Sequence, residues 1–170
     1  MNKVIILGSS GSGKSTFAKA LQKLTNLPLY HLDNIWWKPN KTHISRAEFD
    51  LNLNNIICQP SWIIDGDYSR TYEIRLKYCD TVFFLDYDID ICLEGINSRI
   101  NKIRDDIPYI DTYVDDYLVK NIKEYPKNKR LILLELFNQY ENKNINIFNS
   151  RLDADVWLDK YQKSTFNCEI

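Results

Sequence analysis

The sequence predicts an α/β fold of three layers, in which helices cover both faces of a five-stranded parallel sheet. Short apolar runs alternate with longer stretches of helical period, the pattern of strands and helices in such a fold. Most of these runs are nearly continuous in apolar residues, as strands buried on both faces are. A glycine-rich turn, Gly8 to Gly13, joins the first run to the first helical stretch. We expect a single domain over residues 1–170, because no linker, repeat or low-complexity tract interrupts the pattern.

Each expected strand is one of the short apolar runs. In chain order they are Val4–Leu7, Leu29–Leu32, Trp62–Ile64, Val82–Leu85 and Ile145–Phe148. The first helix follows the glycine-rich turn and carries Phe17, Leu21 and Leu24 on one face. The second helix opens with the capping box Ser45-x-x-Glu48.

Three further helices complete the expected order. A stripe of five apolar residues predicts a helix that runs to about Arg104, and its members are Ile89, Leu93, Ile96, Ile100 and Ile103. A second helical stripe before the last strand consists of Leu133, Leu136, Phe137 and Tyr140. The final helix is expected to start at the cap Ser150-x-x-Asp153.

Composition excludes several classes of function. The formal net charge is -1, so nothing in the charge balance favours DNA, RNA or an anionic membrane as a partner. The first apolar run stops at Gly8 and is too short for a signal peptide or a membrane span, so we expect a cytoplasmic protein. No Cys-x-x-Cys pair indicates a zinc site or a disulfide framework among the four cysteines, Cys58, Cys79, Cys92 and Cys168.

The glycine-rich turn matches the P-loop pattern G-x-x-x-x-G-K-[ST] as Gly8-Ser9-Ser10-Gly11-Ser12-Gly13-Lys14-Ser15, and it lies between an expected strand and an expected helix. The glycines let the backbone curl so that successive N–H groups point at phosphate oxygens, and the following helix adds its positive end. Lys14 is expected to reach the β- and γ-phosphates of ATP, and the Ser15 hydroxyl to bind Mg²⁺. We expect residues Gly8 to Thr16 to form the ATP phosphate site, with a flexible turn as the alternative.

Three aspartates each follow an expected strand, so they reach the same edge of the sheet as Lys14: Asp33, Asp65 and Asp86. Asp65 begins Asp65-Gly66, which resembles the strand end of adenylate kinases, and the resemblance implies that Asp65 positions Mg²⁺; an ordinary turn residue is the alternative. The position of Asp33 is similar to that of the aspartate that binds the acceptor hydroxyl in small-molecule kinases such as shikimate kinase. For the stretch Asp86–Asp90 we expect a helix-capping role.

Four arginines are candidates for stabilising charge during phosphoryl transfer. Arg70 and Arg75 are expected on the acceptor side. Arg99 and Arg104 precede an acidic segment, and this region, about residues 100–115, looks like the lid of nucleoside monophosphate kinases, where arginines close over the triphosphate. A surface position is the alternative for each arginine taken singly.

Four aromatic or imidazole side chains near Asp33 have more ordinary explanations. His31 and His43 stand alone in the sequence, and we interpret each as structural. Trp36 and Trp37 either stack on a planar acceptor or pack in the core or lid.

Taken together, nearly the whole chain resembles the DNA topology modulation proteins (FlaR-type), a branch of adenylate-kinase-like P-loop proteins. The resemblance depends on Gly8-Ser15, His31-Leu32-Asp33 with Trp36-Trp37, Trp62-Ile63-Ile64-Asp65-Gly66 with Tyr68-Ser69-Arg70, Asp80 to Asp86, the segment Arg99 to Pro108, and Asn149-Ser150-Arg151. It implies a nucleoside-monophosphate-kinase-like fold with a short lid, ATP as the donor, and an adenine site at Asn149, Ser150 and Arg151.

Two functions from different classes remain open. The first is an ATP- and Mg²⁺-dependent kinase that transfers phosphate to a small-molecule or nucleotide acceptor, with Lys14, Asp33, Arg70, Arg99 and Arg104 as catalytic candidates and Ser15 and Asp65 at the metal. The second is a regulator that binds ATP and signals through a partner with little transfer. Direct DNA binding, which the name of the family suggests, has no support in charge or motif.

Overall fold

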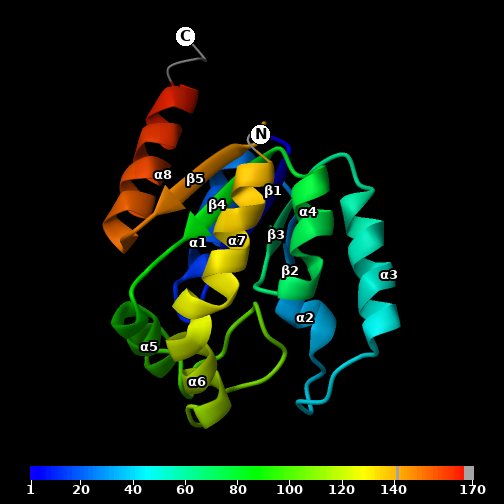
Figure 1. The fold of residues 1–170 in the computed structure, drawn as a ribbon, viewed down its shortest axis with the longest axis vertical. Helices are drawn as coiled ribbons and strands as arrows, with labels where there is room; N and C mark the ends of the chain where they lie inside the picture. Colours follow the sequence, from blue (N-terminus) through cyan, green and yellow to red (C-terminus); the bar gives the residue numbers. More distant parts are fainter. Residues whose placement is uncertain (141, 167–170) are drawn as a thin grey trace.

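The computed structural model describes residues 1–140 and 142–166, so Cys168 lies outside the described part of the chain. The described residues form the predicted three-layer fold (Figure 1). All strand pairs are parallel, and the order across the sheet is β2-β3-β1-β4-β5. The strands are β1 (Lys3–Gly8), β2 (Leu29–His31), β3 (Trp62–Asp65), β4 (Thr81–Leu85) and β5 (Asn144–Phe148). Each predicted strand is confirmed to within one residue at either end.

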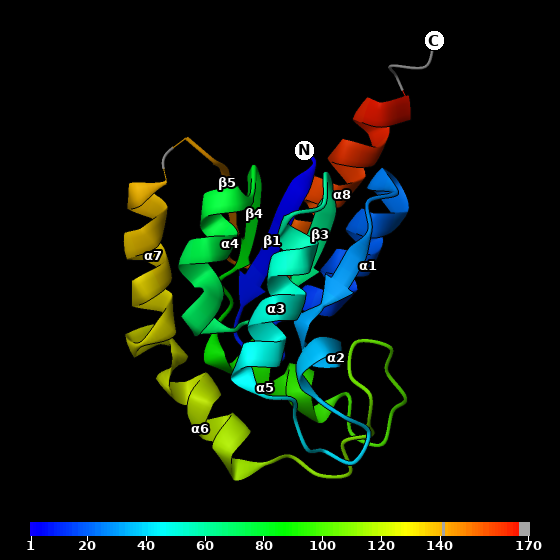
Figure 2. The same ribbon diagram turned by 90° about the vertical axis from the view of Figure 1, so that its right-hand side faces the viewer.

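Helices cover both faces of the sheet, as Figures 1 and 2 show from two directions: α3, α4 and α7 lie on one face, and α1 and α8 on the other. The remaining helices α2, α5 and α6 gather at the edge where the strands end. Two 3₁₀ turns, Ser69–Thr71 and Tyr125–Lys127, precede α4 and α7. The helix bounds are α1 (Lys14–Thr25), α2 (Leu32–Trp36), α3 (Arg46–Ile57), α4 (Tyr72–Tyr78), α5 (Ile89–Asn97), α6 (Asp116–Glu124), α7 (Lys129–Gln139) and α8 (Arg151–Phe166).

The central strand shows why the apolar runs are continuous. Ile5 and Leu7 of β1 belong to the core beneath α3, α4 and α7, whereas Val4 and Ile6 belong to the core beneath α1 and α8. Successive side chains of a strand point to opposite faces, so a strand covered on both faces needs an apolar residue at every position. β1 is therefore buried on both faces up to the point where it ends at the P-loop.

The predicted helix caps are present in the structure. The Ser45 hydroxyl accepts a hydrogen bond from the backbone N–H of Glu48 at 3.1 Å and begins α3. The Ser150 hydroxyl accepts one from the N–H of Asp153 at 3.1 Å and begins α8. Each bond satisfies a donor that the first helical turn leaves without a partner.

The prediction for α5 was wrong at its end, because the helix stops at Asn97 and not near Arg104. The Asn97 side chain donates to the carbonyl of Leu93 at 2.8 Å, and the Ser98 hydroxyl donates to that of Gly95 at 2.9 Å. Such local bonds compete with helix propagation. Ile103, the last residue of the apolar stripe, is 87% exposed, so no packing rewards a longer helix.

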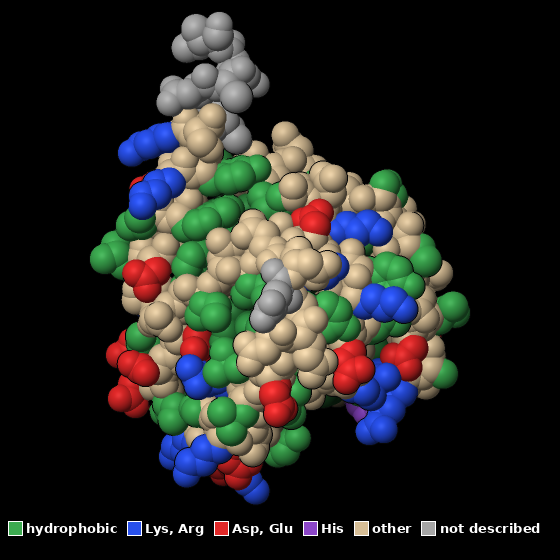
Figure 3. All heavy atoms as spheres, turned by 45° about the horizontal axis from the view of Figure 1, so that its top comes forward, with side chains coloured by type: hydrophobic (Ala, Val, Ile, Leu, Met, Phe, Trp, Pro, Cys, Tyr) green, Lys and Arg blue, Asp and Glu red, His purple; other side chains and the backbone are tan. Residues whose placement is uncertain are grey.

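No helix in the described part of the chain has the length and apolar content that a bilayer span requires. Figure 3 shows a face on which basic and acidic side chains lie interspersed, which agrees with the balanced charge of the sequence.

Candidate active site

A cavity of about 970 Å³ opens at the edge of the sheet where the strands end. Most of its lining comes from the P-loop with the start of α1, residues 98–115 between α5 and α6, and the first half of α8. The ends of β3 and β4 and parts of α2, α5 and α6 complete it. We call residues 98–115 the lid. This is the position at which open α/β sheets bind ligands, outside the carboxyl ends of their strands.

The P-loop has the backbone that the motif predicts. Gly8, Gly11 and Gly13 have φ values of 144°, 81° and 93°, which side-chain-bearing residues rarely adopt. The Lys14 ammonium donates to the carbonyl of Ser9 at 2.9 Å. Of the predicted phosphate site, Gly8 and Ser9 lie outside the cavity lining, and the residues that line it are Ser10, Gly11, Ser12, Gly13, Lys14, Ser15 and Thr16.

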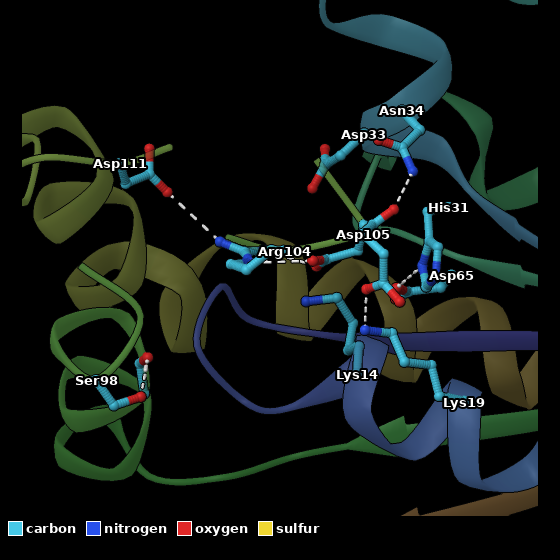
Figure 4. Close-up of polar contacts among 12 residues, drawn as sticks. Lys14, Lys19, His31, Asp33, Asn34, Asp65, Ser98, Arg104, Asp105 and Asp111 are labelled. Atoms are coloured by element: carbon cyan, nitrogen blue, oxygen red, sulfur yellow. Dashed lines mark hydrogen bonds and ion pairs between the residues drawn. The ribbon is translucent and has the colours of Figure 1, made fainter. Parts of the chain in front are cut away.

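Asp33 points into the cavity from the first turn of α2, opposite Lys14 (Figure 4). The Tyr68 hydroxyl donates to its Oδ1 at 2.7 Å. Burial raises the pKa of the Asp33 carboxyl, the Tyr68 hydrogen bond opposes that change, and the nearby charge of Asp65 adds to it. A carboxylate whose protonated form is favoured by its surroundings accepts a proton more readily than an exposed one.

Asp65 lies at the end of β3 and its side chain is almost fully buried. Its Oδ2 is 2.8 Å from Nδ1 of His31, and His31 pairs with Asp65 in the register of β2 and β3. Oδ1 of Asp65 is buried and has no hydrogen-bond partner among the described residues. From the sequence, His31 was expected to be a lone structural residue, and its contact with a carboxylate of the cavity was not predicted.

Both lid arginines line the cavity, but their surroundings differ. Arg104 donates to the Asp106 carboxylate through Nε at 3.0 Å and Nη2 at 2.6 Å, and its Nη1 lies 3.4 Å from Asp111. The guanidinium of Arg99 has no ion pair or hydrogen bond within residues 1–140 and 142–166. Burial lowers its pKa, with the charge of Arg104 contributing further. An unpaired, partly buried cation is available to an anionic ligand.

The lid is held across the cavity by contacts with both walls. The Lys19 ammonium of α1 pairs with the Asp105 carboxylate. The side-chain amide of Asn34 on α2 donates to the carbonyl of Asp105 at 2.6 Å. Burial alone would raise the pKa of Asp106, but hydrogen bonds from Arg104 and from the Ser15 hydroxyl hold it well below its usual range. The lid therefore places a carboxylate beside the predicted metal ligand Ser15, which sequence reasoning missed although Asp105-Asp106 follows Arg104 directly.

The two arginines expected on the acceptor side lie elsewhere. Arg70 is exposed and makes a bidentate pair with Asp50 of α3, at 2.9 and 2.7 Å, and it does not line the cavity. Arg75 is fully buried, where it donates to the carbonyls of Gly66 and Tyr68. Arg75 thus holds the loop after β3 through hydrogen bonds to its backbone. The guanidinium groups of Arg70 and Arg75 both lie outside the cavity lining.

The stretch Asp86–Asp90 contains the N-cap of α5, which is Asp88, as expected. Asp86 itself lies outside the cavity lining and accepts hydrogen bonds from Nε of Arg130 at 2.7 and 3.0 Å. The sequence left open whether Trp36 and Trp37 stack on an acceptor or pack in the core or lid, and the structure places the two side chains differently. Trp36 stacks on His43 with ring centroids 4.4 Å apart and packs on the core, whereas Trp37 lines the cavity.

The predicted adenine site is only partly assembled. Asn149 and Ser150 both bond to Asp153 in the first turn of α8. The N–H of Asn149 donates to the Asp153 carboxylate at 3.2 Å, and the Ser150 hydroxyl accepts from the N–H of Asp153. Arg151 lines the cavity and donates to the carbonyl of Ile91 at 3.2 Å. Further along α8 the cavity wall continues with Ala154, Asp155 and Leu158.

Solved structures similar to this chain are shikimate kinases. The enzyme of Acinetobacter baumannii in complex with shikimate matches with a TM-score of 0.63 and 15% identity, covering 100% of this chain and 96% of that one. The enzyme of Bacteroides thetaiotaomicron matches with a TM-score of 0.55 and 18% identity, covering 95% and 96%. No protein-family model and no curated protein matches the chain significantly. At these identities the likeness shows the fold alone, a five-stranded parallel sheet with helices on both faces.

Proposed function

We propose that this protein is an ATP- and Mg²⁺-dependent phosphotransferase that acts on a small-molecule or nucleotide acceptor. One observation carries the proposal: a P-loop lysine and a partly buried carboxylate, Lys14 and Asp33, line one cavity from opposite walls beneath an arginine-bearing lid. Phosphoryl transfer needs such a site, because its catalysis consists mostly of positioning and charge stabilisation.

In this proposal each wall has its own task. The backbone N–H groups from Gly8 to Thr16 hold the phosphates of ATP, and Lys14 neutralises the outer ones. Asp33 accepts the proton of the acceptor hydroxyl, which its raised pKa favours. Arg99, with no carboxylate partner in the described chain, faces the transferred group, whereas Arg104 organises the lid through Asp106 and Asp111.

The residues present fit Mg²⁺. Mg²⁺ prefers oxygen ligands, keeps several waters, and is usually bound through one or two carboxylates together with substrate phosphates. The Ser15 hydroxyl and the partnerless Oδ1 of Asp65 supply such oxygens. The described residues contain no cluster of three or more His, Cys, Asp or Glu that could bind a metal alone, which agrees with a site completed by the nucleotide. When bound, the ion would neutralise charge on the phosphates.

A more specific assignment, to the FlaR-type DNA topology modulation proteins, also belongs to this proposal. It is supported by the location of three of its motifs, since the P-loop, Asp33 and Asp65 all contribute to the cavity lining. We further propose that the base of ATP lies near Arg151.

The test is transfer of label from ATP. The protein is incubated with ATP labelled at the γ-phosphate, Mg²⁺ and a panel of nucleosides, nucleotides and small alcohols, with shikimate among them. Label on one acceptor supports the proposal, and Lys14→Ala should abolish that transfer while the circular dichroism spectrum stays unchanged. Tight ATP binding without label on any acceptor would refute transfer and favour the ATP-binding regulator.

A further inference from the structure

The histidine beside the candidate metal site is built into the sheet. His31 is the last residue of β2 and Asp65 the last of β3, and the two are paired in the parallel register. Paired residues on neighbouring strands present their side chains on the same face, here at the edge that opens into the cavity. Figure 4 shows the imidazole turned toward the carboxylate, with Nδ1 and Oδ2 2.8 Å apart.

Of the two carboxylate oxygens of Asp65, Oδ2 has a hydrogen-bond partner among the described residues and Oδ1 has none. An ionised carboxylate only accepts hydrogen bonds, so Nδ1 of His31 is the donor to Oδ2. No other described residue donates to this side chain, and Oδ1 is buried without a partner. The exposed fractions are 11% for the His31 side chain and 4% for that of Asp65, so water does not replace the contact freely. Without His31, the Asp65 carboxylate has nothing in the described chain to fix its orientation.

We propose that His31 is a positioning residue for the magnesium–nucleotide complex, acting through Asp65. By holding Oδ2, it turns Oδ1 toward the metal's water shell and keeps the carboxylate from rotating onto other donors. Groups that orient a metal-binding carboxylate typically contribute about 10–100-fold to metal affinity or activity. This inference rests on the proposed function, but it concerns binding and needs no knowledge of the acceptor.

The experiment measures how Mg²⁺ changes the affinity for a fluorescent, non-hydrolysable ATP analogue. In wild type, the dissociation constant should be lower with Mg²⁺ than with EDTA. His31→Leu should lose about 10–100-fold of that Mg²⁺-dependent gain and keep its affinity in EDTA. His31→Asn should retain most of the gain, because the amide nitrogen of asparagine can take the place of Nδ1. The matched control is His43→Leu, because His43 is the other histidine of the chain and lies outside the cavity lining. This variant should keep the Mg²⁺-dependent gain in full.

Asp65→Asn supplies a background in which no buried charge is left unpaired. If His31 acts through Asp65, adding His31→Leu to Asp65→Asn lowers the Mg²⁺-dependent gain no further. The comparison of Asp65→Asn with the double variant remains measurable should His31→Leu alone fail to fold.

Three results would overturn the inference: an undiminished gain in His31→Leu, equal losses in His31→Leu and folded His31→Asn, or additive losses in the double variant. Wild type without any nucleotide binding would instead contradict the proposed function itself, so the two failures are distinguishable.

Discussion

Substituting Gly95 by alanine should damage the phosphate site although the position lies in a helix. Gly95 is in α5, where alanine ordinarily favours the helix over glycine by about 0.5–1 kcal/mol. A Cβ built at Gly95, however, would lie only 1.9 Å from the carbonyl oxygen of Gly11 in the P-loop. The reverse approach is equally close, since a Cβ at Gly11 would lie 2.0 Å from the carbonyl oxygen of Cys92. Helix α5 and the P-loop therefore touch backbone to backbone.

The size of the effect follows from this distance. Real Cβ atoms essentially never approach closer than 3.0 Å, so α5 or the P-loop must move by about 1 Å in Gly95→Ala. The Cβ would meet backbone atoms, which cannot move aside as a flexible side chain can. Overpacking of this kind lowers the free energy of unfolding by about 1–3 kcal/mol, which is more than the gain in helix propensity. A displacement of about 1 Å in a positioning element can lower a reaction rate by about 100-fold.

The assay compares Gly95→Ala with Glu94→Ala, which changes an exposed neighbour on the same helix. Urea unfolding should show a lower free energy of unfolding for Gly95→Ala, and titration calorimetry should show weaker ATP binding. Glu94→Ala should leave both unchanged or slightly improved. A raised melting temperature for Gly95→Ala with unaltered ATP affinity would refute the packing argument.

Three further substitutions have expected outcomes. Burial raises the pKa of Asp33 in the folded protein, so ionisation of this carboxyl opposes folding. Asp33→Asn should therefore raise Tm, and the increase should disappear as the pH falls toward about 4, where the carboxyl is protonated in both states. An increase in Tm that does not depend on pH would contradict this. Arg104→Met leaves Asp106 buried without its ion-pair partner, so urea unfolding should show a loss of about 3–5 kcal/mol, whereas a negligible loss would mean that Asp106 finds another donor. Arg70→Ala removes an exposed pair worth about 0.2–1 kcal/mol and should leave ATP affinity and transfer intact; a large fall in transfer would support the acceptor-side role predicted from sequence.

The sheet and the P-loop were predictable because their signals are local. A strand buried on both faces needs a continuous apolar run, as Val4 to Leu7 shows, and the glycine positions of the P-loop are set by backbone conformation alone. The caps at Ser45 and Ser150 are local for the same reason, since each bond spans three residues.

The lid was beyond the reach of such signals. The apolar stripe continues past Asn97 to Ile103, but the side chains of Asn97 and Ser98 bond to carbonyls of α5 where the helix stops, and Ile103 is exposed. The contact between His31 and Asp65 joins residues 34 positions apart, and it requires the register of β2 with β3. In the sequence, Arg70 is as good a candidate for a phosphate contact as Arg99 and Arg104, but in the fold its guanidinium pairs with Asp50. For His31 and Arg70 a partner distant in sequence decided the outcome, whereas the end of α5 depended on a competition between local bonds and the apolar stripe.

The ion pairs of the lid also decide which charges remain for a ligand. Arg104 is neutralised by Asp106 and Asp111, and Lys19 by Asp105, so these five groups hold the lid in place and offer no free charge to a ligand. Among the described residues, the Lys14 ammonium donates only to a backbone carbonyl and the Arg99 guanidinium has no carboxylate partner. Because burial penalises an unpaired cation, both gain most from an anion placed between them. A polyphosphate held by the P-loop, with its outer group toward Arg99, satisfies both cations at once.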